Sequence, residues 1–361
     1  MLTRSSSTRV LLEDELIRLL EIHVPHGRDR QVVQRVLGWD GQGGCLLAQA
    51  GDQFGITRER ARQVYDRAIE QIRGCELSST LGDALAYVHR RRNRAAADIE
   101  AELQERGYTR HRFVMRALWN TARAFGRTPK FVLEETGGKL FVVARAGAVP
   151  AILKAAQRSS SRYGVQTVEE IGRAIAPDCG SANDRLLVRQ VLETRDDLRW
   201  LDMRKQWFWL ASVPRNPVVR CVKKILQFAG SVRVADIQRA IERLPRKRPT
   251  PIPSDALTAF CQQAPFCRVS EGVVERVGSS GAGKPLRRAE AKVCRILKRN
   301  GNELKFGCLE SLCAAVGISR PNLWRIVQYS PLIFRRAPRV YSVITPSVRP
   351  IVDRAVKERT A

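Results

Sequence analysis

Residues 45–73 read CLLAQAGDQFGITRERARQVYDRAIEQIR and carry the strongest structural signal in the chain. Leu47, Ala50 and Phe54 fall on one face of a helix, because residues three or four apart share a face. Gly55 follows and allows a tight turn, since glycine adopts backbone conformations that other residues avoid. Thr57 then has a side chain suited to a helix N-cap. The stretch therefore predicts a helix, a short turn and a second helix.

The second helix combines an apolar stripe with a polar surface. Ala61, Val64, Ala68 and Ile72 recur every three or four residues, as in a helix that buries one face. Helix-turn-helix proteins place the N-terminal end of such a helix in the major groove, where Arg pairs with guanine, Gln with adenine and Glu with cytosine. The DNA-binding candidates in this segment are Thr57, Arg58, Glu59, Arg60, Arg62, Gln63 and Arg67.

This segment resembles region 4 of the bacterial sigma-70 factors, the module that reads the promoter −35 element. The resemblance rests on residues 51–60, GDQFGITRER, and on the Arg62-Gln63 pair, within a matching stretch of residues 28–73. It implies that Arg58, Glu59 and Gln63 contact base edges, with Arg60 and Arg62 shared with phosphates. Nothing in the chain resembles region 2 of that family, so a complete sigma factor is not expected.

The remainder of the chain repeats itself. Four β-rich stretches, each with a polar or Gly-containing centre, predict β-hairpins at residues 131–144, 198–211, 266–277 and 332–344. Their ends lie 67, 66 and 67 residues apart. Three helices are expected before each hairpin. In the third and fourth repeats they are residues 218–229, 235–244, 254–263, 287–299, 308–316 and 319–329.

Three helices and a hairpin in about 65 residues resemble a winged helix-turn-helix. The expected fold is therefore mainly α, with small β-hairpin wings. We expect a helical module at residues 1–76, winged helices at 77–146, 147–212, 213–278 and 285–346, and a basic tail at 347–361. The hairpin with Trp200 and Trp207-Phe208-Trp209 resembles the wing of the RNA polymerase delta-subunit domain. The favoured interpretation of these aromatic side chains is that they pack the hairpin on the helices of its own repeat.

The repeats differ in the polar residues of their expected third helices. The third helix of the first repeat is expected to begin at Thr109 and to display Arg110, His111, Arg112 and Arg116. The third helix of the fourth repeat is expected to begin at Ser319 and to display Arg320, Asn322, Arg325 and Gln328. The second offers Arg185 and Arg189. The third has no basic residue, which favours a spacer or a protein-binding unit. Its charge lies in the loop of residues 245–249, PRKRP, where it suits phosphates or is simply solvated.

The formal net charge of +27 points to a polyanionic partner. Residues 1–76 contain 11 basic and 11 acidic side chains, whereas residues 279–361 contain 17 and 5, so the excess grows toward the C-terminus. No run of 18 apolar residues occurs, which argues against a membrane-spanning helix. The N-terminus turns acidic too early for a signal peptide. A cytoplasmic, nucleoid-associated protein is expected.

The sequence shows no catalytic centre, metal site or cofactor site. None of the nine cysteines forms Cys-x-x-Cys, so buried reduced thiols are expected in place of zinc ligands. Residues 278–284, GSSGAGK, match part of a phosphate-binding loop, but Pro285 stands where Ser or Thr must bind magnesium. We interpret this stretch as a linker. No nucleophile, base and acid converge in the pattern, so an enzyme is not expected.

The sequence thus predicts a bacterial transcription regulator or sigma-like accessory factor that binds double-stranded DNA. The first module reads a short site, and the basic repeats, especially the first and fourth, grip flanking phosphates. One alternative is an interaction scaffold that docks RNA polymerase or another protein and binds DNA weakly and without specificity. The helix-turn-helix would then bind only protein. An enzyme acting on nucleic acid has only the charge in its favour.

Overall fold

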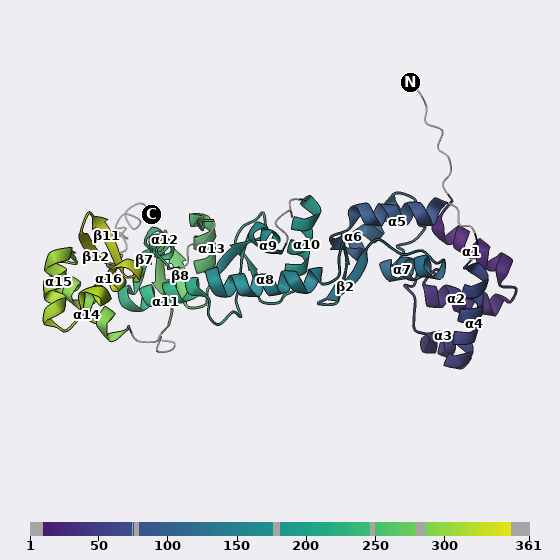
Figure 1. The fold of residues 1–361 in the computed structure, drawn as a ribbon, viewed down its shortest axis with the longest axis horizontal. Helices are drawn as coiled ribbons and strands as arrows, with labels where there is room; N and C mark the ends of the chain where they lie inside the picture. The colour runs from purple at the N-terminus through teal and green to yellow at the C-terminus, as the bar shows by residue number, and fades with distance from the viewer. Residues whose placement is uncertain are drawn as a thin grey trace, which may run out of the picture. The chain divides into compact units, whose positions relative to one another are not determined.

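The computed structural model describes residues 10–73, 75, 79–175, 181–245, 250–278 and 286–347. Within these ranges the chain forms sixteen helices and twelve short strands (Figure 1). The prediction of a mainly helical chain with small antiparallel sheets is confirmed. None of these helices is long and apolar enough to cross a membrane. The basic loop at 246–249, the glycine-rich stretch at 279–284 and tail residues 348–361 lie outside the described residues.

Four helices form the N-terminal part of the chain: α1 (Leu12–His23), α2 (Gly27–Leu37), α3 (Leu47–Phe54) and α4 (Arg58–Ile72). The helix, short turn and second helix predicted within residues 45–73 are present as α3 and α4. The predicted stripe on α4 is buried at Ala61, Val64, Ala68 and Ile72. Gly55 has a left-handed backbone (φ 62°), as the turn requires. The Thr57 hydroxyl accepts from the backbone N–H of Arg60 at 3.2 Å, which confirms the predicted N-cap.

One element order, helix–strand–helix–helix–strand–strand, then occurs four times. The first set is α5 (Ser79–Arg91), β1 (Arg94–Ala95), α6 (Ala96–Glu105), α7 (Met115–Ala124), β2 (Val132–Thr136) and β3 (Lys139–Val143). The second is α8 (Ala148–Tyr163), β4 (Val165–Thr167), α9 (Val168–Ile175), α10 (Ala182–Leu192), β5 (Leu198–Trp200) and β6 (Trp207–Leu210).

The third set is α11 (Pro217–Ala229), β7 (Ser231–Arg233), α12 (Val234–Glu242), α13 (Ser254–Gln263), β8 (Cys267–Ser270) and β9 (Val273–Arg276). The fourth is α14 (Arg288–Arg299), β10 (Glu303–Lys305), α15 (Phe306–Ala315), α16 (Arg320–Tyr329), β11 (Ile333–Ala337) and β12 (Val340–Val343). The four predicted hairpins and the six predicted helices of the last two repeats are present within a few residues of their expected bounds.

Each repeat holds a three-stranded antiparallel sheet in which the last strand lies in the middle. The added strand is the short one that follows the first helix, which the sequence patterns did not predict. A residue with left-handed backbone stands directly before it in every repeat: Asn93, Gly164, Gly230 and Asn302. Gly and Asn tolerate this conformation best, so they let each first helix end and the chain turn into the sheet.

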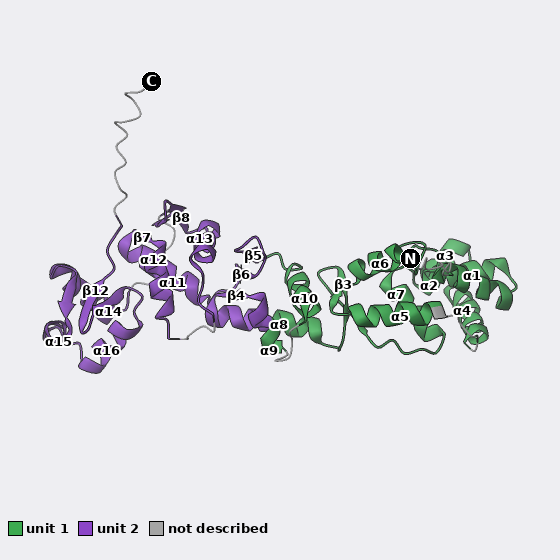
Figure 2. Ribbon diagram, turned by 90° about the horizontal axis from the view of Figure 1, so that it is seen from above, with its two compact units in different colours: residues 1–154, 172–196 green, residues 155–171, 197–361 purple. Residues whose placement is uncertain are grey.

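The chain divides into two compact units, residues 1–154 with 172–196, and residues 155–171 with 197–361 (Figure 2). In the first unit α1–α4 and the first repeat share one apolar core. Trp39 is buried there, and its indole N–H donates to Thr121 Oγ1 on α7 at 2.6 Å. In the second unit one core runs through the third and fourth repeats and includes Trp209. The elements of the second repeat belong partly to each unit.

Gly51 permits the close packing of α3 against the turn that follows it. A Cβ atom at this position would stand 2.7 Å from the backbone oxygen of Ile56. We expect Gly51→Ala to lower the free energy of unfolding by about 1–3 kcal/mol, as overpacking does. Gly172 on α9 has open space around it, so Gly172→Ala should instead stabilise the chain by up to about 1 kcal/mol. Urea denaturation of both variants checks this, and equal effects at the two glycines would contradict it.

Candidate nucleic-acid interface

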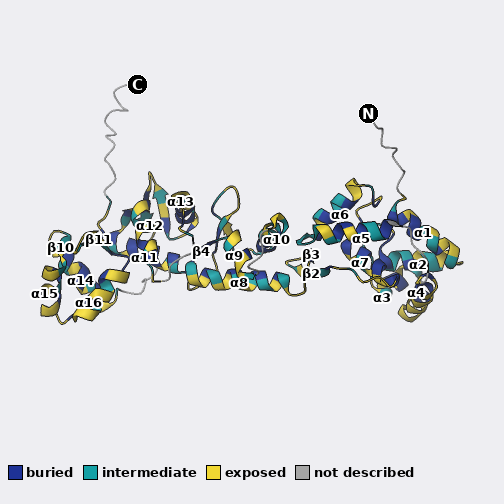
Figure 3. Cartoon of the chain, turned by 45° about the horizontal axis from the view of Figure 1, so that its top comes forward, coloured by how far each residue is buried: buried dark blue, intermediate teal, exposed yellow. Residues whose placement is uncertain are grey.

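The first two turns of α4 form an exposed polar surface. Figure 3 shows exposed residues on α4. The residues predicted from sequence are all exposed: Thr57, Arg58, Glu59, Arg60, Arg62, Gln63 and Arg67. At 3.6 residues per turn, Glu59 and Gln63 lie opposite the buried stripe. Arg58 and Arg62 lie on one side of them, with Arg60 and Arg67 on the other. Two side chains that can read base edges are thus flanked on both sides by arginines that can reach phosphates.

The arginines of this surface differ in what they already bind. Arg62 donates to Glu59 (Nη2–Oε1 2.6 Å) and to Asp66 (Nη1–Oδ2 2.7 Å). The hydrogen bond from Arg62 lowers the pKa of the Glu59 carboxyl, and the same contact raises the pKa of Arg62. Within the described ranges, the side chains of Arg58, Arg60 and Arg67 make no hydrogen bond or ion pair. These three guanidinium groups are therefore open to an external anion.

Helix α2 holds the turn before α4 in place. The guanidinium of Arg28 donates to the backbone oxygen of Phe54, and also to that of Gly55 at 3.4 Å. Arg35 donates through Nε to Gln53 Oε1 at 3.0 Å. Leu46 gives α3 no side-chain cap, but Gln49 accepts from the Leu46 N–H at 3.0 Å. These contacts fix α3 and the turn, so the start of α4 is presented on a rigid support.

The prediction that the first repeat's third helix begins at Thr109 is wrong. Helix α7 begins at Met115, and Thr109 is buried with no hydrogen bond to its hydroxyl. The backbone N–H groups of Arg110 and His111 donate instead to the buried carboxylate of Glu13 at 2.9–3.1 Å. Arg110, His111 and Arg112 therefore lie in a loop before α7, and only Arg116 lies on the helix.

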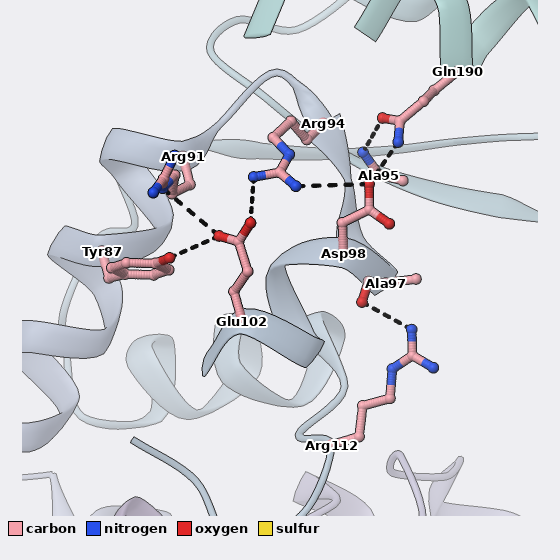
Figure 4. Close-up of polar contacts among 9 residues, drawn as sticks. All are labelled: Tyr87, Arg91, Arg94, Ala95, Ala97, Asp98, Glu102, Arg112 and Gln190. Atoms are coloured by element: carbon pink, nitrogen blue, oxygen red, sulfur yellow. Dashed lines mark hydrogen bonds and ion pairs between the residues drawn. The ribbon is translucent and has the colours of Figure 1, made fainter. Parts of the chain in front are cut away.

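The three arginines predicted for the first repeat are held in ion pairs within the protein. Arg110 pairs with Asp14, Arg116 pairs with Glu135, and Arg112 Nε lies 3.5 Å from Glu100. Arg112 also donates to the backbone oxygen of Ala97 at 2.8 Å (Figure 4). Glu100 caps α7 by accepting from the Met115 N–H at 2.7 Å, and burial raises the pKa of its carboxyl. More than half of each arginine side chain is still exposed.

Helix α10, the third helix of the second repeat, makes hydrogen bonds to the first repeat. Gln190 accepts from the backbone N–H of Ala95 at 2.8 Å and donates to Asp98 at 2.6 Å, as Figure 4 shows. Asp184 accepts from Asn93 Nδ2 at 2.6 Å. Of the two basic candidates on this helix, Arg185 is exposed and Arg189 is half-buried. Polar side chains of α10 thus hydrogen-bond to the segment of the first repeat where β1 leads into α6.

The aromatic hairpin of the second repeat packs on the third repeat. The rings of Trp209 and Phe260 on α13 lie 4.9 Å apart in an edge-to-face contact. Gln263 on the same helix donates to the Trp200 backbone oxygen at 2.7 Å. Trp200 and Phe208 contact each other within the hairpin. Helix α13, which has no basic residue, is therefore engaged in protein packing at this surface.

The fourth repeat exposes more of its third helix. Helix α16 begins at Arg320, with Ser319 as the N-cap residue and Pro321 in the first turn. The predicted residues Arg320 and Arg325 are exposed, and Asn322 is half-buried. Arg320 pairs with Glu310 at 3.0 Å, and Arg325 donates to Asn322 Oδ1 at 3.1 Å.

The sequence prediction missed the arginines of the fourth hairpin. Arg335, Arg336 and Arg339 are exposed on β11 and in the turn that leads to β12. Arg336 pairs with Glu303 at 3.0 Å. Arg335 and Arg339 have no ion pair in the described part of the chain. The sequence did contain a signal for this basic hairpin, because residues 335–339, RRAPR, include three arginines.

A basic cavity of about 800 Å³ was also not predicted. Its cationic lining residues are Arg162, Arg220, Lys223, Lys224 and Arg287. Lys224 is already neutralised, since its ammonium donates to the buried carboxylate of Glu290 at 2.6 and 2.7 Å. Arg220, Lys223 and Lys224 lie on α11, so the third repeat also has basic side chains outside the loop at 245–249.

Most of the described cysteines are buried, as expected. Cys221, Cys261, Cys267, Cys294 and Cys313 are buried, Cys45 and Cys75 are half-buried, and Cys308 is exposed. Burial raises the pKa of the Cys221 and Cys294 thiols to about 12. These thiols stay protonated at neutral pH and pack as small apolar groups. No group of three or more His, Cys, Asp and Glu side chains able to hold a metal ion occurs among the described residues.

No protein-family model matches the chain, and a search of curated proteins finds no match.

Proposed function

We propose that this chain is a non-enzymatic bacterial DNA-binding protein that acts in transcription, and that the start of α4 reads a short duplex site. The observation that carries the proposal is the surface on the first two turns of α4. Glu59 and Gln63 lie between arginines there, and the side chains of Arg58, Arg60 and Arg67 make no hydrogen bond or ion pair within the described residues. Asp66 and Glu70 continue the same face and repel phosphates. Duplex contact is therefore limited to the N-terminal end of α4, as in a recognition helix.

The four repeats are proposed to be winged helix-turn-helix units. Their element order and their three-stranded sheets support this. Helices α7, α10 and α13 contact other parts of the protein through Thr121, Gln190 and Phe260. The hairpin β11–β12 exposes Arg335 and Arg339, which have no ion pair within the described residues, so the fourth repeat is the best candidate for binding phosphates. The first repeat contributes less than its sequence suggested, because its arginines are paired internally.

The test is fluorescence anisotropy of the full chain on a −35-like duplex and on a scrambled duplex, titrated with salt. We expect a preference of about 10³-fold or more that survives physiological salt, the range of sequence-specific proteins. Equal affinities with a steep salt dependence would contradict site reading, because counterion release alone produces that behaviour. A −35-like duplex is the first probe because of the resemblance to sigma region 4.

A second candidate function is a scaffold that docks RNA polymerase or another protein. It is favoured by a polar groove of about 510 Å³ in the first unit, formed by the C-terminal half of α4 and by α7. Asp66 and Glu70 line it together with Arg73 and Arg123. A surface of both signs suits a protein better than a polyanion. On this hypothesis the chain binds DNA only weakly and without specificity.

A further inference from the structure

Trp324 differs from every other tryptophan of the chain. All six tryptophans lie in the described ranges, and Trp324 alone is exposed, with 52% of its surface in solvent. It lies on α16 and contacts Phe306 edge to face, with ring centroids 5.7 Å apart and planes at 87°. Phe306 in turn contacts the buried ring of Tyr341 on β12 at 5.8 Å. The indole is therefore held at a fixed angle while much of it stays open.

The surroundings of Trp324 are basic. Arg320 and Gln328 lie one turn before and one turn after it on α16, and both are exposed. Arg335 on β11 stands directly opposite Tyr341 on β12, so the two side chains share one face of the sheet. That face carries the Tyr341 ring that contacts Phe306. Arg335 thus lies on the side of the sheet where the Tyr341 ring contacts Phe306, which in turn contacts Trp324.

The charge of the whole repeat has the same sign. Residues 286–347 contain twelve basic and three acidic side chains. Glu290 is buried against Lys224, and Glu303 and Glu310 each pair with an arginine. An apolar protein partner would have to place its surface within this positive field. A polyanion that carries flat aromatic rings is attracted by the positive charge of the repeat and can also stack on the Trp324 indole.

We propose that the Trp324 surface of the fourth repeat, made of Trp324, Arg320, Arg325, Gln328 and Arg335, binds single-stranded nucleic acid, with an unpaired base stacked on the indole. In a duplex the faces of each base are covered by its neighbours, so an exposed aromatic ring finds a stacking partner only where a base is unpaired. The arginines bind the phosphates on either side. This goes beyond the duplex reading proposed for α4 and does not depend on it.

The test is anisotropy of the full chain with labelled 20-nucleotide oligo(dT) and oligo(rU). Trp324→Leu keeps an apolar contact with Phe306 but removes the stacking surface, and we expect binding to weaken about 10-fold or more. The salt slope should not change, because the phosphate contacts remain. Trp324→Phe should recover part of the loss. Tyr329→Leu removes an exposed aromatic from another side of α16 and should change binding less than twofold. The ratio of the affinities for oligo(dT) and oligo(rU) shows whether this surface prefers single-stranded DNA or RNA.

A second readout uses the wild-type chain. Iodide quenches exposed indoles, so it reports chiefly on Trp324, and bound oligonucleotide should protect this fluorescence. Wild-type affinity in Trp324→Leu, or no protection from iodide, would overturn the proposal and leave the surface to a protein partner. Failure of the duplex proposal is a separate result, because Trp324→Leu leaves α4 intact and should keep any preference for the −35-like duplex.

Discussion

Replacing Arg58 and Gln63 together by alanine is expected to lower the affinity for the preferred duplex by about 100-fold or more. A bidentate contact to a base is worth about 1–3 kcal/mol, and this variant removes two such candidates. Both side chains are exposed on α4, so the fold should be kept. Affinity for a scrambled duplex should fall only slightly, since one positive charge is lost. Anisotropy on the two duplexes measures both effects.

The matched control for this variant is Arg18→Ala with Gln71→Ala. It also removes one exposed arginine and one exposed glutamine, from α1 and from the last turn of α4. It should bind both duplexes nearly as the wild type does. If the Arg58 and Gln63 variant keeps its duplex preference, α4 does not read the site. If it loses only weak nonspecific binding but still captures RNA polymerase, the scaffold function is supported.

The helix-turn-helix could be predicted because its signals are local. Gly55, Thr57 and the stripe from Ala61 to Ile72 act on residues at most a few positions away, and the structure uses each of them as expected. The hairpins were predictable for the same reason. Gly137 and Gly138 both have positive φ and form the two-residue turn between β2 and β3. Patterns of this kind depend on neighbours along the chain.

The start of α7 could not be predicted because its cap comes from elsewhere. Thr109 has the side chain of an N-cap, yet the backbone of this loop is held by Glu13 on α1 and by Glu100 on α6. Glu13 is 97 residues from Arg110 in sequence, and no periodic pattern links the two. The carboxylates override the local preference because they satisfy backbone N–H groups that burial would otherwise leave unpaired.

Contacts between successive repeats were missed for a similar reason. The sequence favoured packing of the aromatic side chains of the second hairpin on the helices of their own repeat, whereas the structure shows Trp209 in contact with Phe260 on α13 of the next repeat. Arg243 at the end of α12 donates to the backbone oxygens of Val327 and Ile333, and to that of Gln328 at 3.2 Å. It thereby caps α16 from the preceding repeat. An internal period identifies the repeats but carries no information on which side chains join them.

The second large effect is expected from Glu290→Ala. The Glu290 carboxylate is buried and accepts from the Lys224 ammonium at 2.6 and 2.7 Å and from the Ser330 hydroxyl at 2.6 Å. Removing one partner of a buried ion pair costs about 3–5 kcal/mol, because the other charge is left unpaired. Lys224 is one-third exposed, so we expect a loss near the lower end, about 3 kcal/mol. Urea denaturation measures it.

The control variants separate the buried pair from charge alone. Glu310→Ala removes a carboxylate of the same repeat that is one-third exposed and pairs with the exposed Arg320, and it should cost under about 1 kcal/mol. Lys224→Met combined with Glu290→Leu removes both charges and should recover much of the stability lost in Glu290→Ala. Equal losses in Glu290→Ala and Glu310→Ala would contradict a special role for the buried pair.

The same variant tests whether the third and fourth repeats unfold together. Glu290 lies on α14 and Lys224 on α11, and both helices contribute to a single apolar core. Residues in one core lose protection against hydrogen exchange in one cooperative step. In Glu290→Ala, peptides from α11 and α14 should therefore lose protection equally, although only one of them carries the change. Loss confined to α14 would instead mean that the repeats fold as independent domains, each stable without its neighbour.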